Sequence, residues 1–174
     1  ALAWAVTLPF EFRFYGRRYT SLFVNSDGNL TFEEAEHAST PRSLGRFVGG
    51  PPRIGALFSD LDPEAGGGVT VDATGERAVF TWFEVPQFRQ RDKNTFQMTL
   101  WASGRIDFAY GTNITPTMAE AVAGLAPGRD EGGLLAVDLS NPSGSSSGAI
   151  AEGFRSDQEF DIVAVARKFY RTHG

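Results

Sequence analysis

Strict alternation of apolar and polar residues near the N-terminus is the feature that most restricts the fold of this chain. In residues 9–16, PFEFRFYG, three phenylalanines point to one side, and Glu11, Arg13 and Tyr15 point to the other. A period of two is typical of a β-strand with one buried face. Similar short segments, separated by turn signals such as NSDG at 25–28, recur up to residue 139. The pattern predicts an all-β fold, an antiparallel β-sandwich over residues 1–140.

The last part of the sequence differs in composition from the first 140 residues. Residues 141–155 begin with NPSGSSSG, whose Gly and Ser content predicts a flexible linker. Residues 156–174 begin with SDQE, the pattern of a helix capping box, and continue with apolar residues at helical spacing. We therefore expect one C-terminal helix, interpreted as the start of a following domain. A strand is the alternative, since residues 160–165 include β-branched side chains.

Composition excludes several classes of function. The 174 residues include no cysteine, which removes disulfides, zinc–thiolate sites and thiol catalysis. The formal net charge of -5 argues against a nucleic-acid partner. No apolar run approaches the roughly 20 residues of a membrane-spanning helix, so we expect no membrane insertion.

Motifs for catalysis are missing from the sequence. The only histidines are His37, in the stretch 33–53 that we interpret as a long surface loop, and His173 near the end. Neither the Gly-x-Ser-x-Gly elbow nor the His-Glu-x-x-His zinc motif occurs. We therefore expect no catalytic residues and no enzymatic activity.

The acidic segment SDLDPE at residues 59–64 is a candidate calcium site. Its alternate carboxylates, Asp60 and Asp62, can offer oxygen ligands to Ca²⁺, and Asp27 from the preceding hairpin turn can join them. The 12-residue pattern of an EF-hand is absent. Aspartates beside Gly- and Pro-rich turns also cap backbone amides, so turn capping or a salt bridge is the alternative interpretation.

Several aromatic residues do not fit the predicted core pattern and are candidates for binding a ligand or partner: Tyr15, Tyr19, Phe83 and Trp101. If these rings are exposed together, they would form a strip for glycans or proteins, because amphipathic rings favour interfaces. Packing against a neighbouring domain or against the predicted C-terminal helix is the alternative.

A series of these segments resembles the nidogen-like (NIDO) extracellular domain and its bacterial relatives. The resemblance rests on LPFEFRFYG at 8–16, YTSLFVNSDG at 19–28, LTF at 30–32 and IGALFSDLD at 54–62, followed by shorter pieces up to about residue 126. Animal members usually stand beside Cys-rich modules, so the missing cysteines favour a bacterial-type relative.

The resemblance implies a non-catalytic interaction, adhesion or architectural module of a larger secreted or cell-surface protein. Its expected partners are other extracellular proteins or neighbouring domains of the same chain. A carbohydrate-binding module that uses exposed aromatics is one alternative. An accessory domain or pro-domain of a secreted hydrolase is another.

Overall fold

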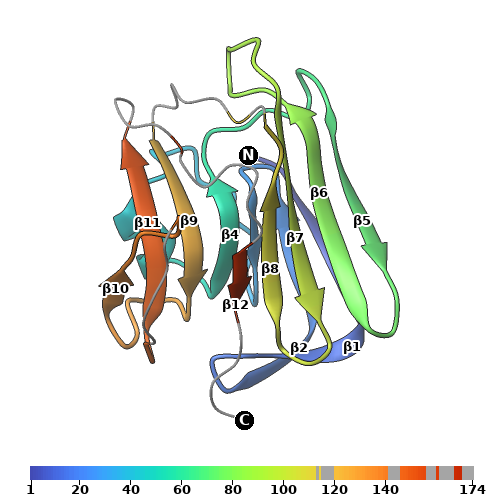
Figure 1. Cartoon of the computed structure of the whole chain (residues 1–174), viewed down its shortest axis with the longest axis vertical. Helices are drawn as coiled ribbons and strands as arrows, with labels where there is room; N and C mark the ends of the chain where they lie inside the picture. The colour runs from blue at the N-terminus through green and yellow to red at the C-terminus, as the bar shows by residue number, and fades with distance from the viewer. Residues whose placement is uncertain (113, 115–119, 141–145, 156–159, 161–166, 170–174) are drawn as a thin grey trace.

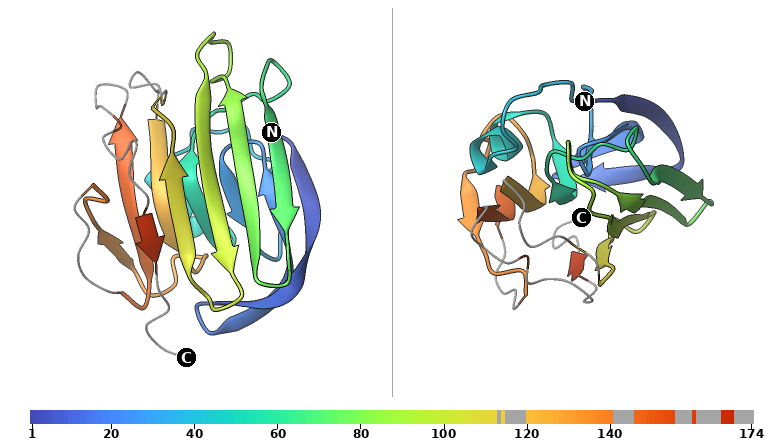
Figure 2. Two further views of the ribbon diagram at one scale, coloured as in Figure 1. Left: turned by 45° about the vertical axis from the view of Figure 1, so that its right-hand side comes forward. Right: turned by 90° about the horizontal axis from the view of Figure 1, so that it is seen from above.

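The computed structural model describes residues 1–112, 114, 120–140, 146–155, 160 and 167–169. Within these residues the strands form two sheets, which pack face to face as a β-sandwich (Figures 1 and 2). The seven-stranded sheet has the order β1-β2-β3-β4-β9-β11-β10, with β1 Ala3–Phe14, β2 Arg17–Asn25, β3 Asn29–Thr31, β4 Arg53–Phe58, β9 Glu120–Ala126, β10 Leu134–Ala136 and β11 Ala149–Arg155. The five-stranded sheet has the order β12-β8-β7-β6-β5, with β5 Gly68–Ala73, β6 Arg77–Val85, β7 Asn94–Trp101, β8 Ile106–Tyr110 and β12 Arg167–Phe169.

Alternation along the strands creates the core between the sheets. In β6, Ala78, Phe80 and Trp82 are fully buried, whereas the residues between them are partly exposed. Trp82 stacks on Phe96 of the neighbouring β7, with ring centroids 5.1 Å apart. The pairings among the described strands are antiparallel except that of β10 with β11. The predicted all-β sandwich is confirmed.

The NSDG turn joins β2 to β3 as the sequence predicts. Gly28 has a φ of +76°, a left-handed conformation that favours glycine. A Cβ atom at this position would stand 1.9 Å from the carbonyl oxygen of Leu57. Gly28 therefore allows the hairpin to approach β4 closely.

A single short helix in the described part of the chain, α1 (Leu44–Gly49), lies within the stretch predicted as a surface loop. The hydroxyl of Ser43 caps it by accepting a hydrogen bond from the Arg46 amide at 3.2 Å. Phe47 is fully buried and packs with Phe58. Through this contact α1 covers part of the seven-stranded sheet on the side away from the main core.

The predicted linker over residues 141–155 is wrong for 149–155, which form β11. This strand pairs with β9 and β10, and the earlier part of the linker, residues 141–145, lies outside the described residues. The Gly/Ser composition predicts flexibility from local sequence only. Ala149, Ala151 and Phe154 nevertheless bury their side chains, and this burial favours a strand.

The predicted C-terminal helix over residues 156–174 is wrong at 167–169, which form β12 and pair antiparallel with β8. Phe160 is only 3% exposed and packs on Tyr110 and Phe154 with centroid distances of 5.1 and 4.6 Å. The remainder of the predicted helix lies outside the described residues. The sandwich therefore extends past the predicted boundary at residue 140, because pairing with β8 is a contact that local helical spacing does not reveal.

Candidate functional site

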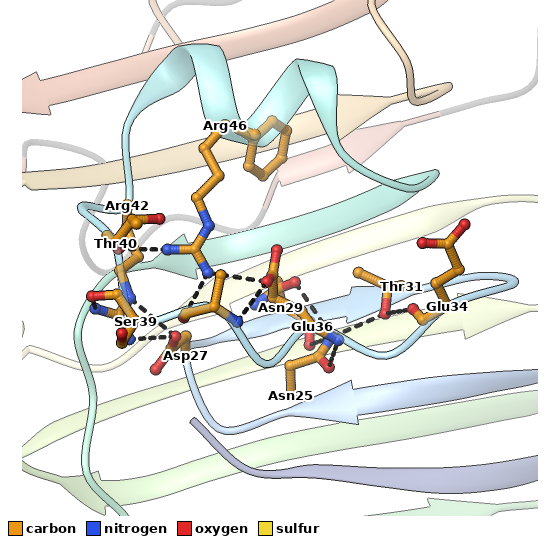
Figure 3. Close-up of polar contacts among 12 residues, drawn as sticks. Asn25, Asp27, Asn29, Thr31, Glu34, Glu36, Ser39, Thr40, Arg42 and Arg46 are labelled. Atoms are coloured by element: carbon orange, nitrogen blue, oxygen red, sulfur yellow. Dashed lines mark hydrogen bonds and ion pairs between the residues drawn. The ribbon is translucent and has the colours of Figure 1, made fainter.

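Charged side chains gather beneath the 33–43 loop, which connects β3 to α1. We call this cluster the arginine network, and its members are Arg42, Arg46, Arg53, Asp27, Glu36 and Asp60. Figure 3 shows most of it beside the hairpin residues Asn25, Asn29 and Thr31. Arg53 comes from β4, Asp27 from the β2–β3 turn and Arg46 from α1, so the network joins the loop to all three of these segments.

Arg53 is the centre of the network, and its side chain is fully buried. Its Nη2 lies 2.8 Å from Oε2 of Glu36, and its Nη1 donates to Oδ1 of Asn29 at 2.9 Å. The guanidinium also stands over the ring of Phe58, 4.6 Å from the centroid. Burial lowers the pKa of Arg53, but an arginine still stays protonated in proteins. A full positive charge is thus held between a carboxylate, an amide and an aromatic face.

Glu36 accepts from two arginines. Its Oε1 lies 3.0 Å from Nη2 of Arg46, which also donates to backbone carbonyls of Ala38 and Thr40. Burial of Glu36 opposes its ionisation, but the hydrogen bonds from Arg53 and Arg46 and from the Ala38 amide together outweigh that cost. They lower the pKa of Glu36 from 4.5 to about 2. Glu36 is therefore an anion that ties the loop to β4 and α1.

Arg42 forms the second centre of the network. Its Nε and Nη2 both donate to Oδ2 of Asp27, at 2.9 and 2.7 Å, and Nη2 lies 3.3 Å from Oδ1 of Asp60. Burial raises the pKa of Asp27, although Arg42 acts in the opposite direction. The other oxygen of Asp27, Oδ1, is buried and has no hydrogen-bond partner among the described residues.

Amide side chains of the β2–β3 hairpin complete the attachment of the loop. Asn25 Nδ2 donates to Oγ1 of Thr31 at 3.0 Å, and its Oδ1 accepts from the Glu36 amide at 3.0 Å. Thr31 donates in turn to the carbonyl of Glu34 at 2.6 Å. The polar groups of the hairpin are thus used to position the loop.

The structure brings two of the three predicted calcium ligands together. Asp27 and Asp60 meet through the guanidinium of Arg42, as the salt-bridge alternative predicts. Asp62 instead accepts from the Glu64 amide at 3.1 Å, which is the turn-capping alternative. Among the described residues no group of three or more acidic or histidine side chains is arranged to hold a metal ion. Calcium binding stays a prediction.

Tyr15 and Tyr19, two of the predicted binding aromatics, pack onto the sandwich at the turn between β1 and β2. The Tyr15 hydroxyl donates to the Gly148 carbonyl at 2.8 Å, and burial raises its pKa. The Tyr19 ring stacks on Phe32 with centroids 4.3 Å apart, and its hydroxyl donates to Glu33 at 3.2 Å. Both rings are engaged within the domain.

Phe83 and Trp101, the other two predicted binding aromatics, stand at opposite ends of β6 and β7. Trp101 pairs with Arg77, six residues from Phe83 along β6, which corresponds to about 20 Å along a strand. Phe83 is 56% exposed. Trp101 lies between the guanidinium groups of Arg77 and Arg105, at 5.5 and 5.4 Å. The four predicted aromatics therefore do not form one continuous strip.

Sequence reasoning missed the arginine network. Glu36, Arg42 and Arg46 lie in a polar stretch that is typical of a solvated loop, and Arg53 follows two prolines. The one available signal was the number of charges of both signs in this stretch.

Comparison with known proteins gives one match. A model of the family described as NIDO related matches residues 1–159. Neither a search of curated proteins nor a search of solved structures found a match. In the described part of the chain, no helix has the length and apolar character needed to cross a membrane.

Proposed function

Because this chain belongs to the NIDO-related family, we propose that it is a non-catalytic interaction or architectural module of a larger secreted or cell-surface protein. Its partners are other extracellular proteins or neighbouring domains of the same polypeptide. The family is of an extracellular type, and the proposal follows from that membership together with the way the chain uses its charged residues.

The arginine network is the observation that supports a structural role for those residues. Asp27 and Glu36 are among the buried acidic side chains of the described part of the chain, and both accept hydrogen bonds from arginines. The arginines keep Glu36 ionised, and a carboxylate whose pKa lies that far below neutral pH is poorly suited to donate or accept protons there. The same contacts fix the 33–43 loop, giving the domain a rigid surface for display.

Two measurements test the proposal. First, intact cells that produce the full-length protein are treated with an added protease, and the domain is followed with a specific antibody. We expect the domain to be cleaved while a cytoplasmic marker stays intact. Protection of the domain until the cells are lysed would contradict an extracellular location.

Second, the purified chain is incubated with chromogenic esters, phosphates and glycosides. We expect no turnover above that of buffer. Turnover that Asp60→Asn abolishes and Asp72→Asn retains would overturn the non-catalytic role, because Asp60 belongs to the arginine network and Asp72 lies on β5, outside that network.

A further inference from the structure

An apolar groove of about 290 Å³ lies between β1 and β5, the strands at one side of the sandwich; we call it the edge groove. Of the six exposed large hydrophobic residues among the described residues, three line it: Leu2, Trp4 and Val71, which are 39%, 43% and 40% exposed. Val6, Val24 and Val69 form its floor and walls.

The edge groove is an uncovered part of the sandwich interior. Trp4 pairs with Val24, which is buried, and Val71 pairs with Phe80, which is fully buried. Directly paired residues share a face of their sheet, so Trp4 and Val71 both project from the core faces. The two sheets therefore leave apolar side chains exposed where one more strand would cover them.

Both strands that border the groove have an edge to which no other described strand pairs. β1 and β5 are terminal in their sheets. The Thr74 amide donates to the Arg77 carbonyl at 2.8 Å, and this fixes which residues of β5 bond to β6. Since hydrogen-bonded and non-bonded pairs alternate, the amides of Val69, Val71 and Ala73 point away from β6. They are donors available to an added strand.

The β5 edge has little of the usual protection against strand addition. Exposed edges are normally blunted by charged side chains, above all Lys, by Pro or by a bulge, and β5, with sequence GVTVDA, has a single charge, Asp72, and no Lys, Pro or bulge. In β1 the register shift and Pro9 fall after Thr7, beyond the part that borders the groove. The charges here are negative, because Glu64 lines the groove and Asp72 is exposed on β5.

We propose that the edge groove binds an extended segment of another polypeptide, which adds as a strand to β5. Alternate apolar side chains of that segment fill the groove against Trp4 and Val71, and its Lys or Arg residues lie near Glu64 and Asp72. This proposal rests on the proposed function as an interaction module and names the chemistry of its partner. Strand addition combines main-chain hydrogen bonds with side-chain specificity.

A second copy of the chain fits the groove less well than a basic segment. Pairing of two β5 edges would extend the sheet and leave both grooves unfilled. It would also bring together the acidic residues of two chains whose formal net charge is -5 each. Like charges at close range are destabilising, so a basic extended segment is the better complement.

The test begins with selection of binders to the whole chain from a displayed library of random peptides about twelve residues long, enough to span a strand. We expect the enriched peptides to alternate apolar residues and to carry Lys or Arg. Their synthetic forms are then measured by titration against Val71→Asn and Ala73→Pro. The first removes an apolar wall of the groove, and the second removes an outward-pointing amide.

Thr70→Asn is the matched control, because Thr70 is on the same strand as Val71 and on its opposite face. We expect Val71→Asn and Ala73→Pro each to weaken binding by about tenfold or more, and Thr70→Asn to leave it nearly unchanged. Hydrogen exchange on the unmodified chain provides a second measurement. Bound peptide should slow the exchange of the Val69, Val71 and Ala73 amides.

Three results would overturn the edge-groove proposal. The first is the absence of enriched peptides, and the second is equal binding to all variants with unchanged amide exchange. The third is a dimer in light scattering that Ala73→Pro dissociates, since this would favour a second copy of the chain as the occupant. Peptides that bind outside the groove would reject this site and leave the module function standing. Turnover by a chain that still binds peptides in the groove would reject the non-catalytic function instead.

Discussion

Arg53 and Glu36 form a 2.8 Å ion pair in which the arginine side chain is fully buried and the glutamate side chain is 9% exposed. Seventeen residues separate the two positions, so the pair fastens the 33–43 loop to β4. Loss of one member of a buried pair leaves a charge without its partner, and this is far more costly than loss of an exposed pair. The first prediction follows from this asymmetry.

Arg53→Met is expected to lower the free energy of unfolding by about 3–5 kcal/mol, because Glu36 and Asn29 lose a buried donor. Urea unfolding at pH 7 measures the change. Arg18→Met is the control: its contact with Glu11 is 3.6 Å long and exposed, so we expect a loss below about 1 kcal/mol. Equal losses in the two variants would show that the buried pair contributes no more to the free energy of unfolding than the exposed pair.

Acid is expected to weaken the fold through Glu36. Its folded-state pKa of about 2 lies below the ordinary value of 4.5. Ionised Glu36 therefore stabilises the fold above pH 4.5, and this stabilisation is lost as the pH falls from 4.5 toward 2. Urea unfolding midpoints measured across this range should fall less steeply in Glu36→Gln than in the unmodified chain. The same pH dependence in both proteins would contradict the lowered pKa of Glu36.

Asp27 is expected to act with the opposite sign. Burial raises its folded-state pKa above 3.8, so the folded protein binds a proton at this carboxyl more readily than the unfolded chain does. This contribution makes the fold more stable as the pH falls through the raised pKa. In Asp27→Asn the loss of stability in acid should therefore be steeper than in the unmodified chain. A shallower loss in Asp27→Asn would contradict the raised folded-state pKa of Asp27.

Gly28 and Gly16 offer a matched pair, because both have a φ of +76°. Gly16→Ala is expected to cost roughly 1–2 kcal/mol for the left-handed backbone alone, since no atom lies within 4 Å of its Cβ position. Gly28→Ala adds a clash with the Leu57 carbonyl, which raises the cost by about 1–3 kcal/mol. Thermal unfolding distinguishes the two variants, and similar melting temperatures would contradict the close approach.

Calcium binding and the Arg42 ion pairs predict opposite results for a thermal melt. At a calcium concentration 100-fold above the dissociation constant, a bound ion would stabilise the fold by about 2.7 kcal/mol, or roughly 5–10 °C. The Arg42 guanidinium already contacts both Asp27 and Asp60 and would repel a cation there, so we expect melts in CaCl₂ and EDTA to coincide. A shift of that size, lost in Asp60→Asn, would establish the calcium site.

The sandwich could be predicted from the sequence because the signal for each strand lies within the strand itself. Alternation in a segment such as Phe10 to Phe14 reports which face of a strand is buried, whatever the partner strand is. The arginine network escaped prediction because Glu36 and Arg53 meet only after the chain turns back on itself. In isolation each of these residues has the pattern of a solvated side chain.

Local signals were misleading where a distant strand decides the conformation. The SDQE capping pattern and the helical spacing after it predict a helix, yet residues 167–169 pair with β8. The edge groove was equally hidden, because Trp4 and Val71 come together only when the two sheets pack. Pairing partners and sheet edges depend on topology, which periodicity alone does not determine.

Phe160 provides the test of whether the segment after β11 belongs to the sandwich. Its ring lies 4.6 Å from that of Phe154 and 5.1 Å from that of Tyr110, so Phe160→Ala is expected to cost about 3–5 kcal/mol in urea unfolding. Phe88→Ala is the control, because Phe88 is 48% exposed and its loss should change stability by about 0.5 kcal/mol or less. If both variants unfold like the unmodified chain, Phe160 does not stabilise the sandwich, and the interpretation of this segment as a separate unit regains support.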